Sequence, residues 1–215
     1  MRLNADFSKR AAIAPDDSLW VHSPEYGVDR LMLDRIGEEV ARATSVVRYA
    51  ADSSFPRHEH AKGEEFLVLE GVFSDETGDY PTGSYVRNPP GSGHTPFSKP
   101  GCRILVKLRQ FDADDLSQFA IDTTDSRGWV GNTLTLHEFG PERVYMQRVD
   151  EGGRLEVDAG FAGTELFVVS GSLSFDNAVW SAESWLRFPP GAVASLTAAE
   201  DTVVWVKTGH LTGEL

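Results

Sequence analysis

Short runs of β-branched and aromatic residues, interrupted by Gly, Pro, Asp and Ser, recur along the whole chain. Clear examples are residues 65–73 (EFLVLEGVF), 84–88 (SYVRN) and 102–111 (CRILVKLRQF). Such runs, with turn residues about every 8–12 positions, predict short strands and favour an all-β sandwich or barrel. Residues 34–43 carry the one helical pattern, and it is too weak for us to predict a helix there.

The same pattern occurs twice, at an offset of 100 residues. GEEFLVLEG (63–71) returns as GTELFVVSG (163–171), and RNPPG (87–91) returns as RFPPG (187–191). Over the 47 positions that begin at residues 63 and 163, 12 residues are identical in a single register. The sequence therefore predicts two copies of one module, with domains 1–115 and 116–215 and an acidic connector within 111–130.

Net charge and cysteine content exclude several kinds of partner and of site. The 215 residues include 20 Lys and Arg against 33 Asp and Glu, a net charge of −13, which disfavours phosphate backbones and anionic lipid. We therefore expect neither nucleic acid nor membrane as a partner. Cys102 is the only cysteine, so an internal disulfide and a zinc site of several thiolates are excluded. No apolar leader or long apolar run is present, and we expect a cytoplasmic protein.

Three histidines and a glutamate of the first copy have the spacing of a metal site. His58 and His60 lie two residues apart, so on a strand they project from one face, and Glu64 follows after a turn. His94 lies on a later segment that could return to the same place. Isolated histidines on strands are usually hydrogen-bonded core or surface residues. Three of the six histidines in two spaced motifs, with a carboxylate, favour a metal site instead.

These spacings resemble the cupin superfamily. Its first motif, G(x)5HxH(x)3–4E(x)6G, is matched by His58, His60, Glu64 and Gly71, with Asp52 in place of the leading Gly. Its second motif, G(x)5PxG(x)2H(x)3N, is matched by Gly83, Pro89, Gly91 and His94, with Ser98 in place of Asn. The resemblance implies two tandem jelly-roll β-barrels, a bicupin, with metal ligands His58, His60, Glu64 and His94. Glu65 would suit the longer spacing, but the six-residue gap to Gly71 favours Glu64. Strand parity is a second argument, because Glu65 would point to the opposite face.

Residues 18–112 look in particular like the cupin domain of ChrR, a zinc-binding inhibitor of extracytoplasmic-function (ECF) sigma factors. The resemblance rests on the stretch from 63 to 98, GEEFLVLEGVFSDETGDYPTGSYVRNPPGSGHTPFS. It implies zinc, whereas the related acetylacetone-cleaving and dihydroxyacetophenone dioxygenases imply Fe(II); Mn and Ni also suit these ligands. We do not expect a sigma-factor partner, because the separate N-terminal zinc domain that binds sigma has no counterpart in this sequence.

The second copy has lost the ligands. At the offset of 100 they become Asp158, Gly160, Thr164 and Ala194. We therefore expect a degenerate cupin domain without metal, although a second ligand pocket there stays open. The other histidines, His22, His137 and His210, match no ligand spacing, and the acidic residues around Gly78 (Asp75, Glu76 and Asp79) read as a solvated turn.

Three functions agree with these features. The first is a metal-dependent, dioxygenase-type enzyme acting on a small oxygenated compound, with Phe66, Val68 and Phe97 lining the pocket and no catalytic residue assigned. The second is a non-catalytic metal-binding sensor or regulator. The third is a purely structural zinc site, which the lack of thiolates disfavours. The expected partner is a small-molecule ligand or substrate, and the sequence also allows a homodimer.

Overall fold

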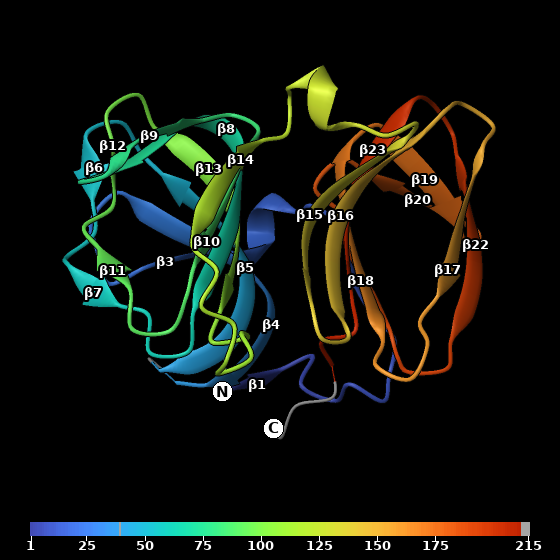
Figure 1. The fold of residues 1–215 in the computed structure, drawn as a ribbon, viewed down its shortest axis with the longest axis horizontal. Coiled ribbons are helices and arrows are strands. Elements are labelled where there is room, and N and C mark those ends of the chain that lie inside the picture. Colours follow the sequence, from blue (N-terminus) through green and yellow to red (C-terminus); the bar gives the residue numbers. More distant parts are fainter. Residues whose placement is uncertain (39, 212–215) are drawn as a thin grey trace. The chain divides into compact units, whose positions relative to one another are not determined.

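The computed structural model describes residues 1–38 and 40–211, and β-strands dominate it (Figure 1). Within these residues the helices are two short 3-10 turns, η1 (Asp17–Leu19) and η2 (Ser126–Gly128), and neither is long and apolar enough to cross a membrane. The sequence showed only a weak helical pattern at residues 34–43, and we predicted no helix there. Residues 34–37 and 41–43 are β-strand. The predicted all-β fold is confirmed.

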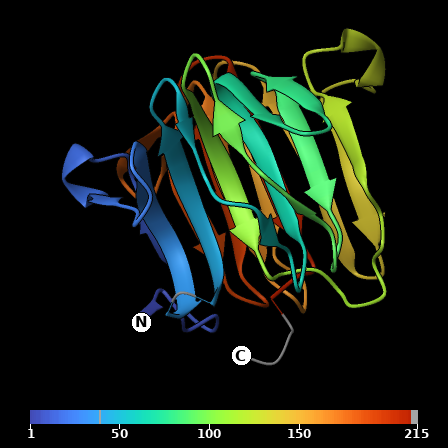
Figure 2. The ribbon, with the colours of Figure 1, turned by 90° about the vertical axis from the view of Figure 1, so that its left-hand side faces the viewer.

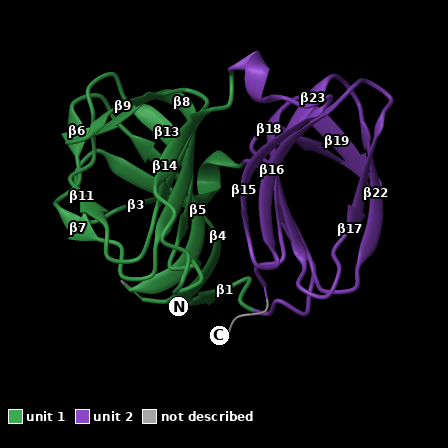
Figure 3. Ribbon diagram, in the orientation of Figure 1, with its two compact units in different colours: residues 1–5, 16–124 green, residues 6–15, 125–215 purple. Residues whose placement is uncertain are grey.

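The chain divides into two compact units (Figure 3). Unit 1 consists of residues 1–5 and 16–124, and unit 2 of residues 6–15 and 125–215. An N-terminal segment of ten residues thus belongs to the same unit as the second repeat. The boundary that we predicted from the sequence, between residues 115 and 116, stays a prediction.

Unit 1 is built on one large antiparallel sheet with short strands at its margins (Figure 2). The main sheet follows the order β1 (Arg2–Leu3), β4 (Val28–Gly37), β5 (Ala41–Tyr49), β13 (Cys102–Leu108), β8 (Glu64–Asp75), β10 (Ser84–Asn88) and β14 (Phe119–Asp122). The marginal strands are β3 (Trp20–His22), β6 (Ser53–Ser54), β9 (Gly78–Pro81) and β12 (Phe97–Ser98). A separate pair consists of β7 (His58–Glu59) and β11 (Gly93–His94).

Unit 2 repeats this order in two antiparallel sheets. The first contains β15 (Thr133–Phe139), β16 (Glu142–Val149), β23 (Thr202–Thr208), β18 (Thr164–Ser170), β21 (Trp185–Phe188) and β2 (Ala11–Ile13). The second contains β17 (Arg154–Asp158), β22 (Val193–Ala198), β19 (Ser172–Phe175) and β20 (Ala178–Ser181). Strand β10 of unit 1 has β14 as its outer neighbour, and its counterpart β21 has β2. Among the described strands no sheet closes on itself.

A β-bulge recurs in both units. The pairing of β8 with β13 shifts between Arg103 and Ile104, and the pairing of β18 with β23 shifts between Val168 and Ser170. In unit 1, Gly71 follows the bulge with a φ of +75°, and a Cβ there would lie 2.0 Å from the carbonyl oxygen of Gly101. Only glycine suits this conformation and this close approach.

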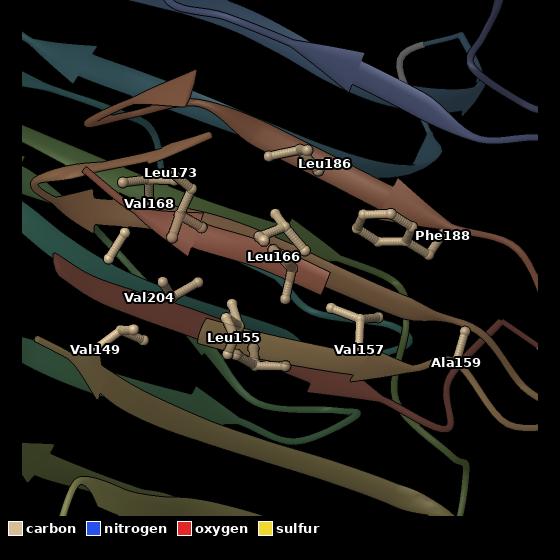
Figure 4. Packing of buried hydrophobic residues seen from close by; sticks show 13 residues of the cluster. Val149, Leu155, Val157, Ala159, Leu166, Val168, Leu173, Leu186, Phe188 and Val204 are labelled. Carbon is tan, nitrogen blue, oxygen red and sulfur yellow. The ribbon is translucent and has the colours of Figure 1, made fainter. Parts of the chain in front are cut away.

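Each unit buries its own apolar cluster. In unit 1 it includes Phe66, Val68, Phe73 and Ile104. In unit 2 it is larger and includes Leu155, Val157, Leu166 and Phe188 (Figure 4). Burial of these side chains is the main contribution to the stability of each unit, because apolar area removed from water contributes about 25 cal/mol per Å².

Candidate metal centre

Short strands and a turn bring the four predicted ligands of unit 1 together. His58 of β7 pairs directly with His94 of β11, His60 follows β7, and Glu64 begins β8. One ligand atom from each residue lies within 4.8 Å of those of the other three. A divalent ion with ligands about 2.1 Å away would leave opposite ligands about 4.2 Å apart, so the cluster has the dimensions of a metal site.

The three imidazoles are held so that their Nε2 atoms remain available. Each Nδ1 lies within hydrogen-bonding distance of an oxygen: the Pro56 carbonyl for His58 (3.0 Å), Ser92 Oγ for His60 (3.1 Å) and Asp75 Oδ2 for His94 (3.1 Å). The Ser92 hydroxyl donates to the Pro89 carbonyl, so it accepts from His60. All three Nδ1 atoms are therefore donors, which leaves the lone pair on each Nε2.

Glu64 completes the cluster from β8. Its Oε1 lies 3.4 Å from Nε2 of His60 and 3.4 Å from Nε2 of His94, and it accepts a hydrogen bond from Asn88. His60 Nε2 is buried and has no hydrogen-bond partner among the described residues. A buried lone pair facing a carboxylate is unfavourable unless a cation lies between them, so these residues suit a divalent metal.

Glu65 lies on the other face of the strand. Its carboxylate accepts hydrogen bonds from Arg87, at 2.9 Å, and from the hydroxyl of Tyr85. It is therefore part of a buried ion pair away from the cluster. This placement is the one expected from strand parity, the second of the two arguments for Glu64 over Glu65.

Burial and the neighbouring carboxylates act differently on two of the histidines. Burial lowers the pKa of His60. For His94, burial also opposes protonation, but the hydrogen bond to Asp75 and the charge of Glu64 outweigh it and raise the pKa. A proton therefore competes with a metal at His94 more than at His60.

Asp75 contacts the centre, and the sequence patterns did not predict this. It is 9% exposed and faces His94, whereas we predicted a solvated turn. A solvated turn does describe its neighbours Glu76 and Asp79, which are exposed. Strand parity counted from Glu64 would have turned Asp75 away. The bulge in β8 reverses that parity, and no sequence pattern marked it.

A cavity of about 380 Å³ adjoins the four ligands. Its apolar wall includes Tyr49, Phe55, Phe73 and Ile104. The predicted liners Phe66, Val68 and Phe97 are not among the described residues that line it. Phe66 and Val68 do share the face of Glu64, but they pack into the buried cluster of unit 1.

The equivalent positions of unit 2 hold no imidazole. Asp158 and Gly160 are exposed, Thr164 is buried and Ala194 is half-buried. Of the remaining histidines, His22 is exposed beside Asp29, and His210 is buried with Nε2 3.3 Å from the carboxylate of Glu165.

The first repeat matches the sequence model of a known protein family. Residues 8–112 match the family described as the ChrR Cupin-like domain. This segment is a ChrR-type cupin domain. The match spans all four clustered residues of the ChrR-type cupin, so the recognition made from the two motifs is confirmed. No curated protein matches the chain.

Solved structures with the same fold cover nearly the whole chain. The bacterial pirin YhhW of Escherichia coli, in complex with nickel(II), is 13% identical over 94% of this chain and 99% of its own, with a TM-score of 0.72. A putative glyoxylate-induced protein of Pseudomonas aeruginosa is 13% identical over 96% and 91% (TM-score 0.74). A putative dioxygenase of Nostoc punctiforme is 12% identical over 96% and 81% (TM-score 0.69). At these identities the likeness shows the cupin-like fold of the chain that carries the ChrR-type cupin, and no more.

Proposed function

We propose that the protein is a bicupin whose first domain is a metal-dependent enzyme of the dioxygenase type, acting on a small oxygenated compound. The second domain, in this proposal, is a degenerate cupin without metal. The location is cytoplasmic, in line with the single cysteine, and the partner is a small-molecule substrate rather than a sigma factor. Self-association to a homodimer is compatible with it.

One observation carries the proposal: three Nε2 lone pairs and a carboxylate converge beside a cavity. Each Nδ1 atom is already engaged elsewhere, so the four clustered residues offer one Nε2 atom from each histidine and a carboxylate oxygen. A five- or six-coordinate ion would keep one or two positions open, unlike the closed tetrahedral geometry of structural zinc. Open positions beside a cavity favour chemistry on a bound molecule. Further support comes from the fold shared with a putative dioxygenase.

The side chains around the centre have separate tasks in this proposal. A bound Fe(II) or another divalent ion would supply a Lewis acid and, for iron, a redox centre. Glu64 offsets part of its charge. Asp75 fixes the tautomer and orientation of His94. Tyr49, Phe55 and Phe73 keep water from the apolar part of a substrate.

The test combines metal content with oxygen uptake. Protein purified without a tag is expected to hold about one metal ion per chain, and His60→Ala and His94→Ala are expected to lose it. With iron bound, oxygen uptake is assayed with acetylacetone and aryl ketones. His22→Ala, which removes an exposed histidine, is the control and keeps metal and activity. Turnover that survives either ligand change, or a protein that cannot be loaded with metal, contradicts the proposal.

A second function is favoured by the match to the ChrR Cupin-like domain. In that case the same ligands hold zinc, and the domain is a non-catalytic sensor or regulator of a small ligand or oxidant. Such a protein would bind metal at His58, His60, Glu64 and His94 but consume no oxygen with any substrate. Recovery of a regulatory protein partner by a tagged chain, together with absent turnover, would favour it over the enzyme.

A further inference from the structure

The cavity beside the metal ligands contains a cation that the proposed metal chemistry does not use. Arg30 lies on β4, is half-buried, and lines the cavity with Val28 and Val47. Its Cζ lies 5.9 Å from the ring centroid of Phe55. The neighbouring Asp29 belongs to the opposite strand face, where it pairs with Arg48 at 2.8 Å.

Arg30 forms no ion pair or side-chain hydrogen bond with any residue in the described ranges 1–38 and 40–211. A guanidinium group is always charged and presents five donors in one plane. Holding it partly out of water without an acceptor is unfavourable, and a carboxylate arriving in the cavity would satisfy two of its donors at once. Its environment therefore points to an anionic ligand.

The charges of the whole cavity point the same way. Its lining includes three arginines (Arg30, Arg35 and Arg109) and two glutamates (Glu59 and Glu64). Glu64 faces the histidines, and a divalent ion there would add two positive charges. The loaded cavity would be positive in a chain with a net charge of −13, so it would concentrate small anions locally.

We propose that the cavity binds a small oxo- or hydroxy-carboxylate, whose neutral oxygen faces the metal ligands while its carboxylate is held by Arg30. This rests on the metal-dependent function proposed above and names its substrate class. Phe55 connects the two ends, because its ring centroid lies 5.4 Å from that of His58 and it also contacts Arg30. A short apolar or aromatic spacer would pack against Phe55, Tyr49 and Phe73.

The test uses matched pairs in which a carboxylate replaces an acetyl group of the same shape. Metal-loaded protein is titrated calorimetrically with 4-acetylbenzoate and 1,4-diacetylbenzene, and with levulinate and 2,5-hexanedione. We expect each keto acid to bind roughly tenfold or more tightly than its neutral partner, as for a charge-assisted hydrogen bond. In Arg30→Met this preference is expected to disappear while the metal content stays at the parent value.

The control is Arg48→Met, which removes the same charge from the exposed strand face and is expected to keep the preference. Equal affinity for acid and diketone in the parent, no binding of either acid, or an undiminished preference in Arg30→Met overturns the proposal. Repeating the titrations after the metal has been removed with a chelator tests the carboxylate site at Arg30 separately from the enzyme proposal. An acid preference that depends on Arg30 in the metal-free protein supports the anion site even if the protein proves to have no metal-dependent activity.

Discussion

At the scale of single residues, Asp75 contacts the centre from outside the predicted ligand set. Its carboxylate lies 3.1 Å from Nδ1 of His94 and also accepts hydrogen bonds from Thr77. Burial acts to raise the pKa of Asp75, but the bond from His94 and, after it, those from Thr77 lower it. It is therefore ionised and fixed in place. A negative charge held behind an imidazole makes that imidazole a better metal ligand.

We expect Asp75→Asn to weaken metal affinity by about 10- to 100-fold, because partners of ligating histidines have effects of this size. Competition against a chelator of known affinity measures it. Asp79→Asn is the matched control, since Asp79 is exposed in the same turn and bonds to Ser74 instead. Equal losses in the two variants would mean that net charge, rather than the contact with His94, governs affinity.

Cys102 gives a prediction that depends on pH. Burial raises the pKa of its thiol to about 11, well above the ordinary value of about 8.5. Between these values the unfolded chain ionises and the native protein does not, so the free energy of unfolding is expected to fall as pH rises through this range. At pH 8 a chromogenic disulfide reagent should react slowly with the folded protein and fully in denaturant. Fast reaction in native buffer would show that the thiol is accessible.

At the scale of elements, the bulge in β8 depends on Gly71. Gly71→Ala must accept both a left-handed φ and a contact with the Gly101 carbonyl oxygen, and we expect it to lose roughly 3 kcal/mol or more of stability. Gly91→Ala has a similar φ, of +84°, but nothing within 4 Å of its new Cβ, so about 1 kcal/mol is expected. Urea unfolding measures both. Equal losses would assign the whole cost to the backbone conformation.

The same bulge limits which side-chain orientations in β8 can be predicted from strand alternation. Strand alternation correctly separated Glu64 from Glu65, because both precede the bulge. Beyond it, alternation fails: Phe73 and Asp75 turn towards the site although Glu64 has the opposite parity. The cavity arginine Arg30 was also missed, because a single arginine in a strand, here directly after Asp29, carries no local signal. The role proposed for Arg30 depends on its having no acceptor among the described residues, and that is visible only in the three-dimensional structure.

At the scale of the whole molecule, the four predicted metal ligands all belong to unit 1, so metal removal should act unevenly along the chain. After chelation we expect faster amide hydrogen exchange in peptides covering 58–64 and 93–94, where the His60 amide donates to the Ser92 carbonyl. The corresponding peptides of unit 2, covering 158–164 and 193–194, serve as the internal control and should not change. An equal response of both sets would place the metal effect outside the proposed site.

The offset of 100 residues predicted two copies of one module, and five strands of the main sheet follow each other in the same order in both units. The outer strands β14 and β2 escaped prediction. Phe119–Asp122 lies in what we read as an acidic connector, and Ala11–Ile13 is too short to show alternation. Pairing partners far along the chain, rather than local preference, make these segments strands.

The pairing of β2 with β21 sets an order of events for the newly made chain. Ala11 pairs with Arg187, so β2 must wait until the chain as far as β21 has been made before it can pair. Closing so long a loop is entropically costly, which makes this step a late one. Until then β21 presents an open edge to other molecules. Removal of residues 6–15 would make that exposure permanent and would leave a protein prone to self-association.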